Sequence, residues 1–178
     1  MSVFTLNLNH DDITIEPSNV FHIDDINNNA LIKEALDFEN HKLDSNPLAS
    51  KYEDSELPDS ESLDHLIYKI DCIVKVNISP FLKLDGHWAH ILHPQQSTMY
   101  HSHTGEREGI SFVYYVKAPE DSGNLVFNFD VANKNFCASI EPEVGKLVLF
   151  PTWIPHYTTR NVSEDTRISI SGNYYSIQ

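Results

Sequence analysis

The chain has 178 residues, of which 40% are hydrophobic and 11% aromatic, and its net charge is −14. This composition is ordinary for a globular protein with a sizeable core, and it excludes wholesale disorder. The first 71 residues hold 16 acidic and 4 basic residues, so we do not expect the chain to bind nucleic acid. No apolar run is long enough to span a membrane.

The N-terminus and the cysteines indicate the compartment. Residues 1–17 contain no basic segment followed by an apolar stretch, so the sequence predicts no signal peptide. Only two cysteines occur, Cys72 and Cys137, and neither belongs to a C-x-x-C pair. We therefore expect both to be reduced and buried in a cytoplasmic protein, with host cytoplasm as the location if a phage encodes it. A catalytic thiol is the second interpretation.

Residues 1–80 are expected to support the rest of the chain with helices and edge strands. Loose alternation of apolar and polar residues in the first twenty positions predicts one or two strands at a sheet edge. Because an edge strand has unpaired backbone groups, two copies of the chain could pair there as a homodimer.

Two helices are predicted before residue 80. In residues 24–42, apolar side chains recur at three- and four-residue steps after an Asn or Asp cap. Residues 44–60 are rich in Pro, Ser and acidic residues and predict an exposed loop. A second amphipathic helix starts at about Glu61, where Ser60 or Asp59 can cap it.

From residue 81 onward the pattern changes to short strands. The runs "HWAHIL", "SFVYYVKAP", "NLVFNF", "KLVLFPTW" and "RISISGNYY" are each bounded by Gly, Pro, Asn or Asp. Such spacing favours an antiparallel sandwich or barrel. We predict an α+β, mainly β fold: one domain over residues 1–178, with a β-barrel core in 81–178 that the N-terminal helices buttress.

Three histidines form the candidate metal site. Residues i and i+2 of a strand point to the same face, so His101 and His103 are expected to project together. His156 follows a strand-like run that ends in a Pro-rich turn, and a histidine pair followed later by a single histidine is the arrangement of a double-stranded β-helix metal site. Three imidazoles suit Zn, Fe or Cu. The alternative is that these are ordinary surface or core histidines.

An arginine near the C-terminus is a candidate anion-binding residue. Strand alternation places Arg167, Ser169 and Ser171 on one face, with Ile168 and Ile170 on the other. An arginine beside small hydroxyl side chains can bind a carboxylate through two hydrogen bonds. The alternative is an exposed arginine paired with a neighbouring acidic residue.

The segments "WAHIL", "HSH", "SFVYYV", "GKLVLFPTWIPH" and "RISIS" together resemble a known family. They are similar to the phage and bacterial, prolyl-4-hydroxylase-like branch of the 2-oxoglutarate/Fe(II)-dependent oxygenases. The resemblance covers roughly residues 88–175. It implies a double-stranded β-helix (jelly-roll, cupin-like) fold, with Fe(II), the co-substrate 2-oxoglutarate and O2. The implied activity is hydroxylation of an unknown substrate, a peptide prolyl residue or a small molecule, with decarboxylation of 2-oxoglutarate to succinate.

The resemblance also implies roles for particular residues. His101, His103 and His156 would be the metal ligands, and Arg167 with Ser169 would bind the distal carboxylate of 2-oxoglutarate. Tyr115 shares a strand face with Ser111 and Val113, and its hydroxyl is either a further contact to that carboxylate or the polar tip of a core aromatic side chain.

The H-x-H pattern departs from most of the superfamily, which has H-x-D or H-x-E. Three interpretations follow: an iron site of three histidines, which we favour; a site completed by Glu106 or Glu108 in the following loop; or the loss of iron binding. Residues 104–110 are either a mobile lip over the site or a plain turn, and Arg107 there could meet an acidic substrate.

Two other classes of protein compete with the oxygenase hypothesis. One is a cupin-type metalloenzyme that uses three histidines without 2-oxoglutarate, and the other is a non-catalytic barrel that binds a ligand. Arg167 favours the oxygenase, because a co-substrate carboxylate needs such an anchor. We expect Trp88 and Trp153 to be core residues. The remaining histidines of this half are interpreted as structural or rim residues, one of which could line the pocket mouth: His87, His90 and His93.

Overall fold

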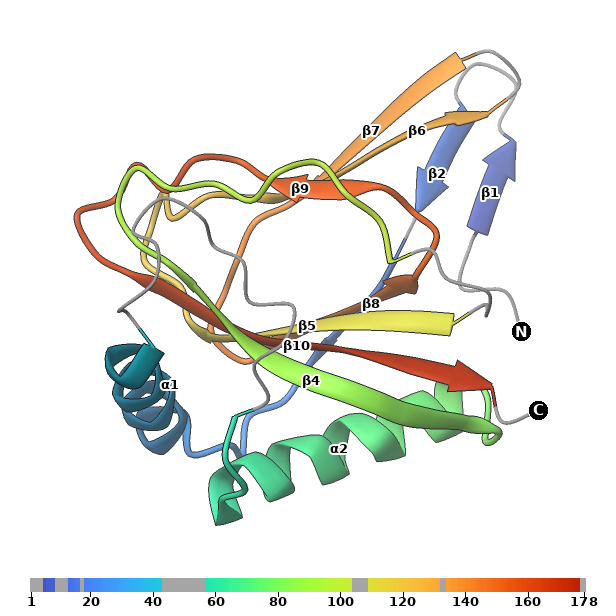
Figure 1. Cartoon of the computed structure of the whole chain (residues 1–178). Helices are drawn as coiled ribbons and strands as arrows, with labels where there is room; N and C mark the ends of the chain where they lie inside the picture. Colours follow the sequence, from blue (N-terminus) through green and yellow to red (C-terminus); the bar gives the residue numbers. More distant parts are fainter. Residues whose placement is uncertain are drawn as a thin grey trace.

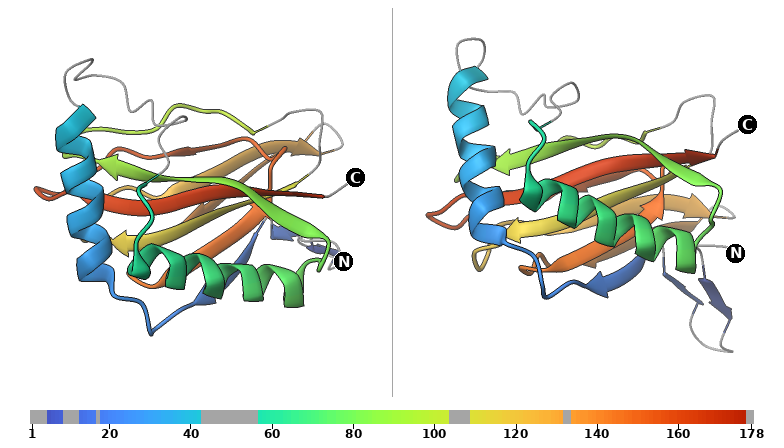
Figure 2. Two further views of the ribbon diagram at one scale, coloured as in Figure 1. Left: turned by 60° about the horizontal axis from the view of Figure 1, so that its bottom comes forward. Right: turned by 90° about the horizontal axis from the view of Figure 1, so that it is seen from below.

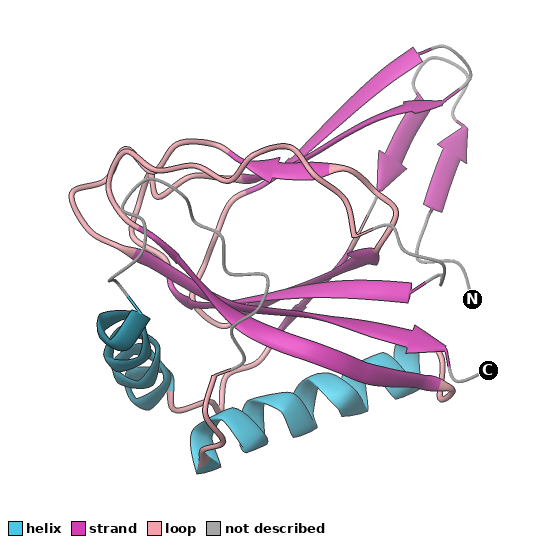
Figure 3. Cartoon of the chain, in the orientation of Figure 1, coloured by secondary structure: helices cyan, strands magenta, loops and turns pink. Residues whose placement is uncertain are grey.

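Two antiparallel sheets face each other in the computed structural model (Figures 1 and 3). The structure describes residues 5–8, 13–16, 18–42, 57–103, 109–131 and 134–176. The larger sheet has five strands in the order β3 (Asn19–His22), β8 (Lys146–Pro151), β5 (Gly109–Lys117), β10 (Arg167–Ser176) and β4 (Leu82–Leu92). The smaller sheet has three strands in the order β7 (Lys134–Ile140), β6 (Leu125–Val131) and β9 (His156–Thr158). Within these ranges, the sheets do not close into a barrel.

The N-terminal strands divide between two places. β1 (Thr5–Leu8) and β2 (Ile13–Glu16) form a separate antiparallel pair, whereas β3 lies at one edge of the five-stranded sheet. The prediction of strands in this region is therefore confirmed. Pairing of two copies through an edge strand stays a prediction.

Two helices cover the outer face of the five-stranded sheet (Figure 2). α1 (Asn28–Lys42) contacts β5, and α2 (Glu61–Asn77) contacts β4. Both confirm the predicted helices. Most of the predicted loop between them, residues 43–56, lies outside the described residues. None of the described helices is both long and apolar enough to cross a membrane.

The cap and the apolar stripe of α2 explain its position. The Ser60 hydroxyl oxygen accepts a hydrogen bond from the Leu63 backbone N–H at 3.1 Å, which satisfies one of the free donors of the first turn. The stripe buried against the sheet consists of Leu63, Leu66, Ile70 and Val74. Of the two caps that the sequence allows, Ser60 and Asp59, the structure uses Ser60, and the three- and four-residue spacing sets the buried face.

The five-stranded sheet separates two apolar clusters. Ile168 and Ile170 point toward the helices and belong to the cluster beneath them. On the opposite face, Tyr115 and Phe150 pack with Phe127 of the smaller sheet. The second cluster therefore joins the two sheets, and it forms one wall of the space between them.

Both cysteines are free and exposed, so the prediction that they are buried is wrong. Cys72 lies between two buried positions of α2 that are four residues apart, and it therefore faces away from the sheet. Cys137 alternates with the half-buried Phe136 and Ala138 of β7 and points to solvent.

Candidate metal centre

The segment that carries His101 and His103 follows β4 and runs beside β9 (Figure 1). The backbone N–H of His101 donates to the His156 carbonyl at 3.0 Å, and the N–H of His156 donates back to the His101 carbonyl at 2.8 Å. The N–H of His103 donates to the Thr152 carbonyl at 2.9 Å. This is an isolated bridge, so the expectation that both histidines lie in a regular strand is wrong. The bridge nevertheless brings two distant segments of the chain together.

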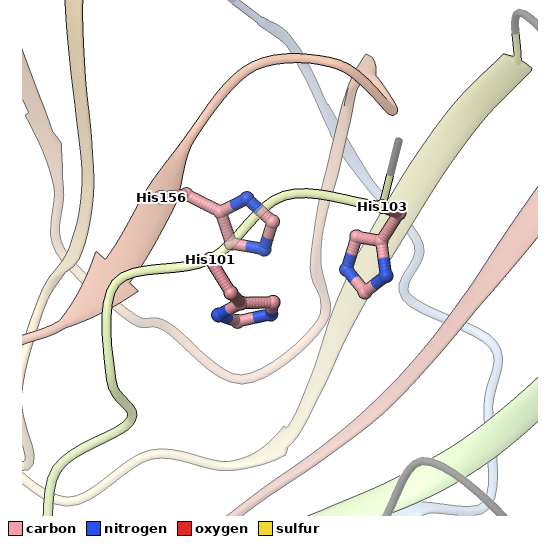
Figure 4. Close-up of side chains that lie close together, drawn as sticks. All are labelled: His101, His103 and His156. Atoms are coloured by element: carbon pink, nitrogen blue, oxygen red, sulfur yellow. The ribbon is translucent and has the colours of Figure 1, made fainter. Parts of the chain in front are cut away.

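The three imidazoles converge (Figure 4). One ligand nitrogen from each of His101, His103 and His156 lies within 4.8 Å of the other two. The ring centroids are 4.4 Å apart for His101 and His156, 5.1 Å for His101 and His103, and 5.2 Å for His103 and His156. The structure thus brings together the three residues that the sequence predicts as ligands, close enough for all three to bind one metal ion.

Backbone carbonyls orient two of these rings. His101 Nδ1 lies 2.8 Å from the Met99 carbonyl oxygen, and His156 Nδ1 lies 3.0 Å from the Ile154 carbonyl oxygen. In each ring the Nδ1–H donates to the carbonyl, which leaves the lone pair on Nε2. Such hydrogen bonds are the usual means by which a protein fixes the tautomer and orientation of a metal-binding histidine.

Burial keeps His103 and His156 neutral. Together with the smaller effect of the neighbouring histidines, it lowers the pKa of His103 to about 4 and the pKa of His156 to about 3. His156 packs against the rings of Phe127 and Phe150. At neutral pH these imidazoles therefore keep the lone pairs that a metal ion requires.

Arg167 is a buried cation that lacks an anionic partner within the described chain. Its side chain is 1% exposed, and burial lowers its pKa. Nη1 donates to the Gly123 carbonyl at 2.7 Å, whereas the buried Nε has no hydrogen-bond partner. Asp165, a neighbouring acidic residue, pairs with Lys117 instead. A buried charge without a counter-ion is costly, so this position suits an anionic ligand.

The three histidines and Arg167 line one pocket. Its empty volume, including the part that is open to solvent, is about 510 Å³. Arg167, Ser169 and Ser171 line it, as strand alternation predicts. Tyr115 lines it too, and its ring lies 5.7 Å from the guanidinium carbon of Arg167. Burial raises the pKa of Tyr115, so its hydroxyl stays a neutral donor.

Two further residues line this pocket: Trp88, which the sequence assigns to the core, and His90, one of the three histidines that the sequence interprets as structural or rim residues. Trp88 is half-buried, with its ring 5.7 Å from that of His103, and His90 stands two residues along the same strand. Their i, i+2 spacing could have predicted this, because it places both side chains on the face of β4 that points toward β9. By contrast, Trp153 is 47% exposed, so its assignment to the core is wrong. His93 bonds the buried Glu39 at 2.8 Å and ties α1 to β4, as a structural histidine.

The residues of the alternative, carboxylate-completed site are outside the described chain. Glu106, Arg107 and Glu108 fall in the undescribed range 104–108. The interpretations that depend on them therefore stay predictions.

Comparisons with known proteins decide the family. No curated protein is similar enough in sequence to count as a relative. Residues 86–173 match the sequence profile of a family described as "Putative 2OG-Fe(II) oxygenase". Residues 86–173 belong to the 2-oxoglutarate/Fe(II)-dependent oxygenase superfamily. Membership makes Fe(II), 2-oxoglutarate and O2 the cofactor, co-substrate and oxidant of this oxygenase.

Solved structures agree on the fold of the oxygenase. A prolyl-4-hydroxylase from Pseudomonas putida has a TM-score of 0.68 and 17% identity, with 91% of this chain and 93% of that chain covered. The viral collagen prolyl hydroxylase of Paramecium bursaria Chlorella virus-1, in complex with 2-oxoglutarate, has a TM-score of 0.66 and 15% identity, with coverages of 92% and 97%. The carbocyclase SnoK from nogalamycin biosynthesis has a TM-score of 0.67 and 12% identity, with coverages of 90% and 79%. The oxygenase therefore has the double-stranded β-helix fold.

Substitution of Gly123 tests how the oxygenase holds Arg167 in place. Its φ is +92°, and a Cβ there would lie 2.4 Å from the Thr159 carbonyl oxygen. We expect Gly123→Ala to destabilise the fold by about 1–2 kcal/mol through backbone strain alone. Because the Gly123 carbonyl accepts from Arg167, 2-oxoglutarate should also bind more weakly. Thermal unfolding measures the loss of stability, and calorimetric titration measures the loss of 2-oxoglutarate affinity. The control is Glu120→Ala, a substitution at an exposed position of the same turn. An unchanged melting temperature of Gly123→Ala would contradict the expected backbone strain.

Proposed function

We propose that the oxygenase binds Fe(II) through His101, His103 and His156 and hydroxylates its substrate while 2-oxoglutarate is converted to succinate and CO2. One observation carries this proposal: the pocket of the three imidazoles also contains a buried arginine that has no anionic partner among the described residues. A three-histidine enzyme that did not use 2-oxoglutarate would leave that charge uncompensated. The arginine therefore favours the oxygenase over the cupin-type alternative.

Each side chain has a role that its surroundings support. The guanidinium of Arg167 would bind the distal carboxylate of 2-oxoglutarate, and the hydroxyl groups of Ser169 and Tyr115 would donate to the same group. Both hydroxyl-bearing side chains are buried in the pocket wall, each 1% exposed. Fe(II) and 2-oxoglutarate, when bound, supply the oxidation chemistry, while the chain supplies position and shelter from water.

Three imidazoles make a metal site that differs in charge from one with a carboxylate. Since His101, His103 and His156 are all neutral ligands, the site would be one unit more positive than a site of two histidines and one carboxylate. We expect this extra charge to strengthen the binding of an anionic co-substrate. It would also slow oxygen activation, so we expect a histidine in place of the carboxylate to lower turnover.

The substrate class is a further part of the proposal. Two of the three structural neighbours are named as prolyl hydroxylases, and the third belongs to the biosynthesis of a small molecule. A prolyl residue in a peptide is therefore our first candidate, and a small molecule is the second. The net charge of −14 argues against a nucleic-acid substrate.

An anaerobic titration tests the proposal. We expect protein loaded with Fe(II) to develop a visible charge-transfer band when 2-oxoglutarate is added, because the keto acid binds the metal through two oxygens. No band at saturating iron would contradict the use of 2-oxoglutarate. O2 consumption that needs iron and ignores 2-oxoglutarate would support the cupin-type enzyme instead. Succinate release with proline-containing peptides then tests the first substrate class.

A further inference from the structure

His90 is a pocket residue that the proposed function leaves without a role. It lies on β4, directly opposite Ser169 of β10 in the sheet register, and it lines the pocket together with Arg167. Burial and, to a smaller extent, the charge of Arg167 lower its pKa to about 3, so the ring is neutral. A neutral imidazole has one N–H donor and one acceptor nitrogen, and the surroundings decide which is which.

Two threonines favour one tautomer of His90. The Thr158 hydroxyl donates to the Thr98 hydroxyl oxygen at 3.0 Å, and that oxygen lies 3.0 Å from His90 Nε2. With its oxygen already accepting from Thr158, the Thr98 hydroxyl has its own proton to donate, and Nε2 can accept it. This arrangement favours the tautomer that carries the ring proton on Nδ1.

The Nδ1–H group has no hydrogen-bond partner among the residues that the structure describes, and Nδ1 is not among the fully enclosed unpaired atoms, so it has access to the pocket. Arg167 lines the same pocket; its Nε is enclosed, whereas its Nη2 has no hydrogen-bond partner among the described residues and is not enclosed. Two unpaired donors of neighbouring side chains suit one acceptor group. A carboxylate has enough lone pairs to accept from both.

We propose that His90 is a further binding residue of the 2-oxoglutarate site, donating its Nδ1–H to the carboxylate that Arg167 binds. This rests on the proposed function and adds to it a residue from the neighbouring strand β4. The Thr98–Thr158 pair holds His90 in the tautomer that can donate. β4 thereby contributes to co-substrate binding, together with β5 and β10.

A purely structural role for His90 has a different signature. Through Thr98, the ring also contacts the segment that continues to His101 and His103. If His90 acted only by holding this segment, its loss would weaken metal binding. If it binds the co-substrate, its loss would weaken 2-oxoglutarate binding and leave metal affinity unchanged.

Two substitutions of His90 separate its two nitrogens. The side-chain amide nitrogen of His90→Asn occupies about the position of Nδ1, whereas that of His90→Gln occupies about the position of Nε2. The measurement is calorimetric titration of 2-oxoglutarate into protein loaded with Mn(II), which does not turn over, together with the Mn(II) affinity itself. We expect His90→Gln to weaken 2-oxoglutarate binding about 10- to 100-fold, the usual effect of a lost hydrogen bond to a charged group. His90→Asn should stay within about threefold of wild type.

Two further arms complete the test. Thr98→Val removes the partner of Nε2 and keeps Nδ1, so its 2-oxoglutarate affinity should fall less than that of His90→Gln. 2-Oxopentanoate lacks the distal carboxylate, so its binding should be insensitive to His90→Gln. Equal affinities of wild type and His90→Gln for 2-oxoglutarate, a weaker His90→Asn than His90→Gln, or a parallel loss of Mn(II) binding would each overturn the inference. Absence of 2-oxoglutarate binding by the wild type would instead refute the proposed function itself.

Discussion

Replacing Arg167 by alanine is expected to weaken 2-oxoglutarate binding by at least about a hundredfold while Fe(II) still binds. The guanidinium is 1% exposed and has no carboxylate partner in the described chain. Loss of one partner of a buried ion pair costs about 3–5 kcal/mol, and each 1.4 kcal/mol is about tenfold in affinity. Titration of 2-oxoglutarate into the anaerobic Fe(II) protein, followed by the visible band, measures the loss.

The unliganded protein should respond in the opposite direction. Without co-substrate, Arg167 carries the desolvation cost of a buried charge, so the volume-conserving Arg167→Met should leave the unliganded fold as stable as wild type or more stable. Arg167→Lys keeps the charge but lacks the fork of donors, and an intermediate affinity is expected. A fall in unliganded stability for Arg167→Met, with unchanged 2-oxoglutarate affinity, would show that the arginine is structural.

Loss of His101 or His156 is expected to remove specific Fe(II) binding. Substitution of a residue that merely orients a metal ligand costs about 10- to 100-fold in metal affinity, and removal of a ligand should cost more. The cluster offers three nitrogens, so each alanine variant leaves only two. Equilibrium dialysis with Fe(II) under anaerobic conditions measures the affinity. His65→Ala is a matched control, since its side chain is 44% exposed on α2 and far from this cluster in the sequence.

The same measurement decides the role of His103. If the site has three histidine ligands, His103→Ala should lose Fe(II) as His101→Ala does, and Glu106→Ala should bind it normally. The reverse result would mean that a carboxylate from the loop completes the site. Retention of full Fe(II) affinity by all of these variants would contradict the metal centre as a whole.

Patterns within single elements predicted much of this fold. The stripe of α2 and its Ser60 cap depend on neighbours three or four residues away, and the structure has both as predicted. The alternation of Arg167 and Ser169 with Ile168 depends only on strand geometry, and it separates the pocket from the core under the helices. The same stripe of α2 could have placed Cys72 at the surface, because that position lies off the buried face.

Other features were missed because their cause lies outside the local sequence. β7 contains Lys, Asn, Cys and Ser and has little strand character by itself, and it forms a strand because β6 pairs with it along its whole length. Trp88 is a large aromatic residue in a strand-like run, which favours a core position, but its side chain lines the pocket instead. The burial of Arg167 against the Gly123 carbonyl joins residues 44 positions apart, which no local pattern contains.

The amino-acid sequence by itself determined the helices, the strand faces and the identity of the residues that could bind a metal ion and a carboxylate. Those properties follow from spacing within one element, where the backbone repeat decides which side chains share a face. Only the tertiary structure decided that His156 lies beside His101, since a single backbone bridge between distant segments brings them together. It alone also left Arg167 buried without an anion and aligned His90 with Ser169, because burial and register depend on how the two sheets pack.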